Sequence, residues 1–273
     1  MPRVRATLLW KRSLKAMVLY LRVLFVAFAY YIGGFLVNSA SALPDETAYE
    51  SYIAGDYEKA VSLAQKAGGS ENLALAARAL NSSAYFIEER KTARRLADRA
   101  FDYSEAAIEA EPMLVEAYLQ SAIALALRGS NMASVKVFFK NIPNRARSRI
   151  DRALELEPEN PWALSTSAAW HLEVVRAGVG RFYGAKRQTG FEQFKKAHAI
   201  APNNISVAYE CALRLLASEN EEWRVTALAA LDAALMIEPQ TAFEAKISAQ
   251  AIDLSMAVKN GRVAEKAFID AKS

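Results

Sequence analysis

The sequence offers few side chains that could perform acid–base or nucleophilic chemistry. Its 273 residues include two histidines, His171 and His198, and one cysteine, Cys211. His171 lies two positions before Glu173, and residues at that spacing on a helix point to different faces, so they do not form an acid–base pair. We interpret both histidines as packing residues between helices, and Cys211, in the apolar run YECALRLL, as a buried free thiol.

Motifs for nucleophilic catalysis, phosphate binding or metal binding are also missing. Ser82–Ser83 and the pair Gly178/Gly180 match no nucleophile elbow, phosphate loop or dinucleotide fingerprint. One Cys and two His are too few for an ordinary zinc site, and a single Cys cannot form an intramolecular disulfide. We therefore predict a protein that is not an enzyme and uses no cofactor or metal.

The distribution of charge argues against a nucleic-acid partner. Residues 1–42 carry six basic and no acidic side chains, whereas the rest of the chain has 28 basic and 30 acidic ones, a net charge of −2. A protein that binds phosphates needs a basic body, so we expect no nucleic-acid binding. The hydrophobic content of 53% is enough to bury a sizeable core.

Residues 1–42 are typical of a targeting segment. Basic residues precede fifteen uncharged ones at 23–37, and Ala40 and Ala42 form an A-x-A cleavage signature before Leu43. Fifteen helical residues extend about 22 Å, less than the roughly 30 Å hydrocarbon core of a bilayer. We therefore expect a signal peptide that is cleaved after Ala42. The alternatives are a retained N-terminal membrane anchor and an organelle transit peptide.

With a cleaved signal peptide or a retained anchor, residues 43–273 would lie on the far side of a membrane. We expect the bacterial periplasm, as a free protein or as one anchored in the inner membrane with its body on the periplasmic side. Met17 begins a compact version of the same leader, so Met1 and Met17 are both candidate start residues.

A phrase of the form Ala-x-x-x-x-Pro occurs four times and predicts four helix ends, because a helix cannot absorb the proline. The phrases are Ala107–Pro112, Ala153–Pro158, Ala197–Pro202 and Ala234–Pro239. Seven residues before each first alanine stands another small residue: Ala100, Ala146, Gly190 and Ala227. Small residues seven apart share one helix face and let a neighbouring helix approach closely. The same spacing of small residues occurs without a proline at Ala60/Ala67 and Ala264/Ala271. In four of the pairs, a large residue lies four positions after the first small one: Ile150, Phe194, Leu231 and Phe268.

This arrangement resembles the tetratricopeptide repeat family, whose 34-residue helix–turn–helix unit has small residues and a closing proline at these points. The stretch GDYEKAVSLAQKA at 55–67 is similar to the family's turn and second helix. The resemblance covers about 45–271 and implies an all-α domain at 43–273, a solenoid of about six helix pairs with a concave groove. The last pair is expected at 241–260 and 262–272. A weaker local similarity over 170–185 is to regulator-of-microtubule-dynamics repeat proteins and their bacterial relatives.

The resemblance also implies that the first helix of each pair lines the groove. The inward positions would then be Glu116, Gln120, Ser165, Tyr209, Lys246 and Gln250. A groove of mixed polar and aromatic residues suits an extended peptide or a helix of a partner. We therefore expect a non-catalytic, exported adaptor that binds a segment of another envelope protein.

The repeat spacing exceeds 34 residues twice, which predicts insertions near 128–150 and 174–191, between the first and second helices of two units. Both insertions lack acidic residues and together carry ten cations: Arg128, Lys136, Lys140, Arg145, Arg147, Arg149, Arg176, Arg181, Lys186 and Arg187. One interpretation is a basic edge of a membrane-peripheral or membrane-anchored protein, which contacts anionic lipid or polymer. The other is a set of longer helices whose cations are solvated or paired with acids of neighbouring units.

Overall fold

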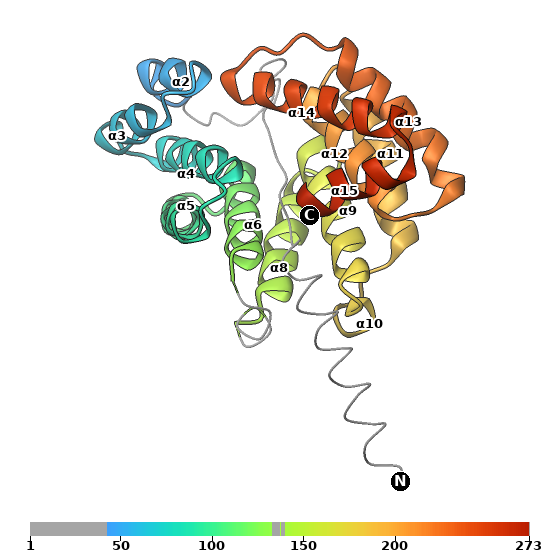
Figure 1. The fold of residues 1–273 in the computed structure, drawn as a ribbon. Coiled ribbons are helices and arrows are strands. Elements are labelled where there is room, and N and C mark those ends of the chain that lie inside the picture. Colours follow the sequence, from blue (N-terminus) through green and yellow to red (C-terminus); the bar gives the residue numbers. More distant parts are fainter. Residues whose placement is uncertain (1–42, 133–136, 138–139, 273) are drawn as a thin grey trace.

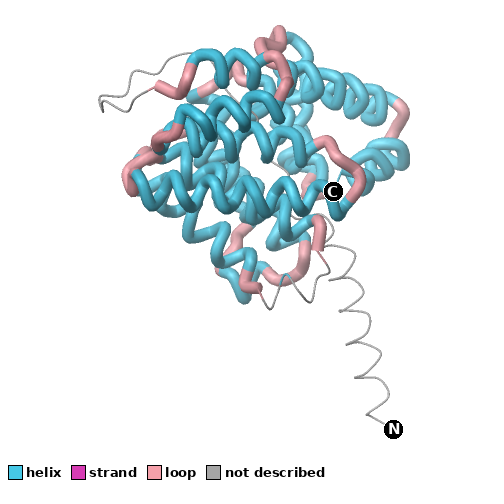
Figure 2. Tube along the Cα trace, turned by 90° about the vertical axis from the view of Figure 1, so that its left-hand side faces the viewer, coloured by secondary structure: helices cyan, strands magenta, loops and turns pink. Residues whose placement is uncertain are grey.

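The structure is a computed structural model of the chain, and it describes residues 43–132, 137 and 140–272. The described residues form thirteen helices and no strand (Figure 1, Figure 2). None of these helices combines the length and the apolar composition that a membrane span requires. The predicted all-α fold is confirmed.

Twelve of the helices make six successive pairs. The pairs are α2 (Glu46–Ile53) with α3 (Tyr57–Ala67), α4 (Ser70–Tyr85) with α5 (Arg90–Ala110), α6 (Val115–Ser130) with α8 (Ile142–Leu156), α9 (Pro161–Arg176) with α11 (Arg187–Ile200), α12 (Ile205–Ala217) with α13 (Glu221–Met236), and α14 (Ala242–Lys259) with α15 (Arg262–Lys272). The short helix α10 (Gly180–Tyr183) lies between α9 and α11. The pairs form a curved array in which α14 returns toward α2 (Figure 1). The predicted tetratricopeptide-like solenoid of six helix pairs is therefore confirmed.

The four prolines and the residues after them set the boundaries between repeats. Helices α5, α8 and α11 each end two residues before a proline of the repeated phrase, and α13 ends three residues before Pro239. Side-chain oxygens then cap the next helix: Asn160 accepts hydrogen bonds from backbone N–H groups at the start of α9, and Asn204 does the same for α12. A cap of this kind stabilises a helix by about 1 kcal/mol.

The small residues of the repeated pattern lie at close helix contacts. Seven of them are alanines with at most 2% of their surface exposed: Ala100, Ala107, Ala146, Ala153, Ala197, Ala227 and Ala234. The eighth is Gly190, where an added Cβ would lie 2.9 Å from Leu172 Cγ and 3.0 Å from the carbonyl oxygen of Ala168. The residues between them, Ile150 and Phe194, are fully buried. The pattern therefore positions successive pairs by close approach.

The two ends of the solenoid do not follow this pattern. Ala67 and Ala271 are exposed, and Ala264 and Phe268 are only partly buried. The last helix, α15, buries Glu265 and Ile269 instead, which lie on a different face from the small pair. The pair at Ala264 and Ala271 thus does not provide a close helix contact.

Candidate functional site

A contact across the solenoid identifies its inner face. The hydroxyl of Tyr85, at the end of α4, donates a hydrogen bond to Glu210 Oε1 on α12 over 3.3 Å, although 125 residues separate them. The ring of Phe243 on α14 packs edge-on against Tyr85, with their centroids 5.4 Å apart. Since the second repeat meets the fifth and sixth directly, these side chains project toward the concave side.

A cluster of four polar side chains joins α4 to α6, and we call it the upstream cluster: Arg78, Asn81, Glu116 and Gln120. Arg78 Nη2 lies 2.5 Å from Glu116 Oε1, and Gln120 donates to the same oxygen over 2.9 Å. Asn81 donates to the side-chain oxygen of Gln120 over 2.9 Å and to its carbonyl oxygen over 3.0 Å. The cluster therefore fixes the orientation of polar groups along two neighbouring first helices.

A second group, the downstream cluster, joins α9 to α12: Glu173, Arg176, Glu210 and Arg214. Arg214 bridges the two acids, with Nη1 2.7 Å from Glu173 Oε1 and Nε 3.0 Å from Glu210 Oε2. Arg176 Nε lies 3.2 Å from the other oxygen of Glu173. The side chains of Glu173, Glu210 and Arg214 are at most 2% exposed, so each charge depends on the others for compensation.

The protonation of the downstream cluster follows from its burial. Burial raises the pKa of Glu210, and the neighbouring Arg214 partly opposes that rise. Burial alone would lower the pKa of Arg214, but the carboxylates of Glu210 and Glu173 raise it overall. The pKa of Tyr85 is raised well above 10, first by burial and then by Glu210, so its hydroxyl remains a hydrogen-bond donor.

The six predicted groove positions have different environments. Gln120, Ser165 and Tyr209 are at most 1% exposed. Glu116 is partly buried in the ion pair with Arg78. Gln250 is half-buried, and Lys246 is exposed with its Nζ 5.0 Å from the ring centroid of Phe86. Two of the six, Glu116 and Gln120, contact each other directly.

Several side chains on the first helices bury a polar atom without a hydrogen-bond partner in the described part of the chain, including four with oxygen atoms on α4, α9, α12 and α14. These four atoms are Asn81 Oδ1 on α4, Ser165 Oγ on α9, the Tyr209 hydroxyl on α12 and Gln250 Oε1 on α14. Tyr209 is also close enough to Asp253 on α14 for the two to interact electrostatically. The first helices of the second, fourth, fifth and sixth repeats thus retain unused hydrogen-bonding capacity.

Sequence reasoning did not identify the buried ion pairs of the downstream cluster. The available signal was Glu210 and Arg214, which are opposite charges four residues apart inside an apolar helix. Glu173 and Arg176, three residues apart, gave a similar local signal, but the contact of Glu173 with Arg214 joins residues 41 positions apart. Only the packing of α9 against α12 brings the two together.

His171 and Cys211 are buried between helices, whereas His198 is only partly buried. His171 is 4% exposed; its Nε2 lies 2.9 Å from Arg147 Nη1, and its Nδ1 accepts from the backbone N–H of Lys186 over 3.1 Å. Burial and then these two cations lower the pKa of His171 to about 4, so the ring is neutral at pH 7. Burial raises the pKa of Cys211 to about 12 and keeps its thiol protonated. No cluster of metal-ligating side chains occurs among the described residues.

The ten cations of the two insertions divide into paired and exposed side chains. Four arginines pair with acids: Arg128 with Asp98, Arg147 with Asp151, Arg149 with Glu105, and Arg176 with Glu173. Arg145 is exposed, although its guanidinium lies 5.0 Å from the ring centroid of Phe101. Lys140, Arg181, Lys186 and Arg187 are exposed, while Lys136 lies outside the described residues. Ala40 and Ala42 of the cleavage signature also lie outside them.

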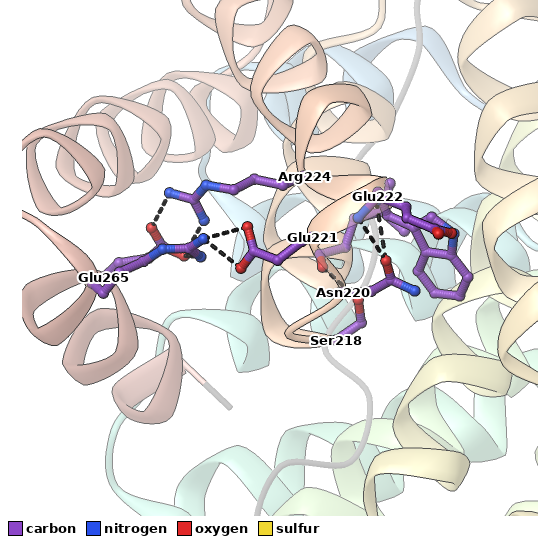
Figure 3. Close-up of polar contacts among 9 residues, drawn as sticks. Ser218, Asn220, Glu221, Glu222, Arg224 and Glu265 are labelled. Atoms are coloured by element: carbon purple, nitrogen blue, oxygen red, sulfur yellow. Dashed lines mark hydrogen bonds and ion pairs between the residues drawn. The ribbon is translucent and has the colours of Figure 1, made fainter.

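Charged contacts attach the last helix to the solenoid (Figure 3). Arg224 on α13 donates to both oxygens of Glu265 on α15 over 2.7 and 2.6 Å. Arg262 donates to both oxygens of Glu221 over 2.5 and 2.6 Å, and Lys266 reaches Glu219 over 2.6 Å. Helix α15 buries only Glu265 and Ile269, so these ion pairs add to the apolar contact that Ile269 makes with the main core.

Comparisons with known proteins match most of the chain. The family model described as regulator of microtubule dynamics protein 1-3 matches residues 45–259. A solved structure of a thermophilic TPR protein from Thermus thermophilus has a similar fold, with a TM-score of 0.52 and 20% identity over 77% of this chain and 97% of that chain. Among curated proteins, none matches the chain.

Proposed function

The chain belongs to the regulator of microtubule dynamics protein 1-3 family, and from this premise we propose that it is a non-catalytic scaffold whose inner face binds a segment of another protein. Its tetratricopeptide-like fold is that of a protein-interaction scaffold. In such solenoids the stacked helix pairs create an extended concave surface, which suits an extended peptide or a partner helix.

The unused polar atoms on the inner face are the observation that carries this proposal. Asn81 Oδ1, Ser165 Oγ, the Tyr209 hydroxyl and Gln250 Oε1 are buried without partners among the described residues. A buried polar group without a hydrogen bond costs about 1–3 kcal/mol. The N–H and C=O groups of a peptide backbone would supply the missing partners, so binding would recover part of that cost.

The contact of Tyr85 with Glu210 blocks part of this surface from a ligand. It crosses the concave side and is reinforced by the packing of Tyr85 against Phe243. A ligand that reaches both Asn81 and Tyr209 must displace this contact. We propose that the scaffold opens between α4 and α14 when its partner binds.

A selection from a displayed peptide library on the purified chain tests this proposal. We expect selected peptides to bind Tyr209→Phe and Gln250→Ala variants about five- to tenfold more weakly, because each substitution removes a hydrogen-bonding atom. Asp232→Asn, on the exposed side of α13, is the matched control and should not change the affinity. Peptides that bind all three variants equally would contradict binding at the inner face.

The exposed cations around α10 favour a second candidate function, contact with an anionic membrane surface. Phe182 is 87% exposed on this short helix, and Arg181, Lys186 and Arg187 are exposed beside it in sequence. An aromatic side chain among cations is suited to the headgroup region of an anionic bilayer. Replacing these three cations by Gln should reduce co-sedimentation with anionic liposomes at low salt. The control Lys195→Gln/Lys196→Gln should not, and equal loss in both would contradict this function.

We also propose that the repeat domain is exported across a membrane, most simply to the bacterial periplasm. The support is the basic and then apolar composition of residues 1–42 and the A-x-A signature at Ala40 and Ala42. The intact mass of the native protein should correspond to a chain that begins at Leu43. An uncleaved chain that stays with membranes in high salt would instead indicate an anchored protein.

A further inference from the structure

Helix α14 carries an apolar stripe that no described part of the chain covers. Ala245, Ala249, Ile252 and Met256 are spaced by four, three and four residues, so they share one face of the helix. All four are exposed, Ile252 by 49% and Met256 by 51% of their surface. The opposite face, which includes Phe243, Ile247 and Leu254, is buried. Helix α14 therefore has apolar residues on both sides but buries only one.

The equivalent face is buried in each of the three preceding repeats. Counted from the repeat proline, the tenth residue is Ala in all four repeats: Ala122, Ala168, Ala212 and Ala249. The first three are at most 1% exposed, whereas Ala249 is exposed. The thirteenth residue behaves in the same way, because Leu125, His171 and Leu215 are buried and Ile252 is not. The stripe on α14 thus occupies positions that take a packed neighbour elsewhere in the solenoid.

We propose that the stripe on α14 packs against the same stripe of a second copy of this chain, antiparallel and about a twofold axis. The two small residues, Ala245 and Ala249, precede the two large ones, Ile252 and Met256, symmetrically about the midpoint between residues 250 and 251. An antiparallel pair with its axis there places Ile252 against Ala249 of the second copy, and Met256 against Ala245. Each large side chain then meets a small one, as close packing of helices requires.

The flanking charges are complementary in the same arrangement. Lys246 and Asp253 are both exposed on one side of the stripe. In the antiparallel pair, Lys246 of one copy lies opposite residue 255 of the other, two residues from Asp253. This offset is about 3 Å along the helix, which a lysine side chain can span. Two intermolecular ion pairs would result, one on each side of the axis. A parallel arrangement would instead place the charges of the two copies on opposite edges of the interface.

The ends of α14 extend this self-complementary surface. Met236 lies six residues before the helix, Val263 lies four residues after it, and each is 87% exposed. In an antiparallel pair, the end of one helix lies beside the start of the other, so Val263 approaches the Met236 side of the second copy. An interface of this size is at the small end of stable interfaces, at about 1,200 Å² or less. We therefore expect micromolar association.

Sedimentation velocity of the purified full-length chain tests the dimer. We expect a dimer at about 100 µM that dissociates on dilution, and a monomer throughout for Ile252→Glu, because the charge would be buried in the interface. Val225→Glu, at a residue that is 76% exposed on α13, is the matched control and should leave association unchanged. A monomeric wild-type chain, or a dimer unaffected by Ile252→Glu, would overturn the proposal.

Two further experiments test the geometry of the pair. A mixture of Ala249→Cys and Ile252→Cys chains should form an intermolecular disulfide more readily than either alone, and the buried Cys211 does not interfere. Lys246→Glu and Asp253→Lys should each weaken the dimer by about fivefold, and the double variant should restore it. Failure of the mixed disulfide together with failure of this rescue would exclude the antiparallel pair.

Discussion

Arg214 is the residue on which the charge balance of the inner face depends most. Its guanidinium contacts Glu173 and Glu210 at once, and all three side chains are at most 2% exposed. Removing one partner of a buried ion pair leaves an uncompensated charge, which costs more than the intact pair contributes. The effect of a substitution therefore depends on whether the remaining carboxylates keep a partner.

For this reason, we expect Arg214→Met to lower the free energy of unfolding by about 3–5 kcal/mol in urea titrations. The matched control is Arg152→Met, because Arg152 pairs with Glu155 at the surface, with side-chain exposures of 39% and 64%. Its loss should cost less than about 1 kcal/mol. Equal, small effects of the two substitutions would show that the Arg214 pairs are not buried as described.

His171 should make stability depend on pH. Its pKa is lowered to about 4 by burial and by Arg147 and Lys186, so the folded chain favours the neutral ring. The stabilisation is fully present above the unfolded pKa of about 6.5 and is lost as pH falls from there toward 4. The free energy of unfolding should therefore fall with pH in both proteins, but in His171→Gln it should fall by about 2 kcal/mol less than in the wild type over this range. This role would be contradicted if the free energy of unfolding, from urea titrations at pH 7 and pH 4, decreased by the same amount in the two proteins.

At the scale of helices, close approach at Gly190 holds α11 against α9. A Cβ at this position would lie within 3.0 Å of Leu172 and of the carbonyl oxygen of Ala168, whose backbone cannot move easily. We expect Gly190→Ala to destabilise the fold by about 1–3 kcal/mol in thermal unfolding, despite the higher helix propensity of Ala. Gly129→Ala is the control, because its nearest neighbour is the side chain of Ile142 at 3.3 Å. A Gly190→Ala chain as stable as the control would contradict this packing.

Helix α15 makes two exposed ion pairs with residues at and just before the start of α13. The pairs of Arg262 with Glu221 and of Lys266 with Glu219 have side chains that are 54–72% exposed, so salt should screen them. We expect hydrogen exchange of the α15 amides to accelerate when salt is raised from about 0.05 M to about 1 M. Amides of α9 should not change over the same range. Unchanged exchange in α15 would show that apolar contacts of Ile269 and Phe268 are sufficient to hold it.

How far the fold follows from the sequence differs between these elements. The four proline phrases and the alanine pairs predicted the helix ends and contacts of α5, α8, α11 and α13, because a proline and a missing side chain act locally. The same small pair in α15, Ala264 and Ala271, did not predict its packing. Helix α15 is instead held by Ile269 in the core and by ion pairs with α13 and Glu219, whose partners lie 41 to 47 residues away in sequence.

For the whole molecule, the resemblance predicted a concave groove, but how strongly the solenoid curves could not be predicted from sequence patterns. The six groove positions were predicted to face inward; in the structure Gln120, Ser165 and Tyr209 are buried, and Tyr85 crosses the concave side to Glu210. Curvature is the sum of small rotations between successive repeats, so no local motif encodes a contact over 125 residues. The burial and the contacts of the candidate site residues therefore follow only from the structure.

Site-specific photo-crosslinking in cells tests the central claim most directly. A photoreactive residue at Glu116 or Gln250 would occupy a predicted groove position outside the proposed dimer contacts, and one at Lys195 or Asp232 would sit on exposed sides of α11 and α13. The account predicts an adduct of one defined mass with another protein from the two inner positions alone. Adducts from the outer positions only, or the same adducts from all four, would contradict a scaffold that binds its partner through the inner face.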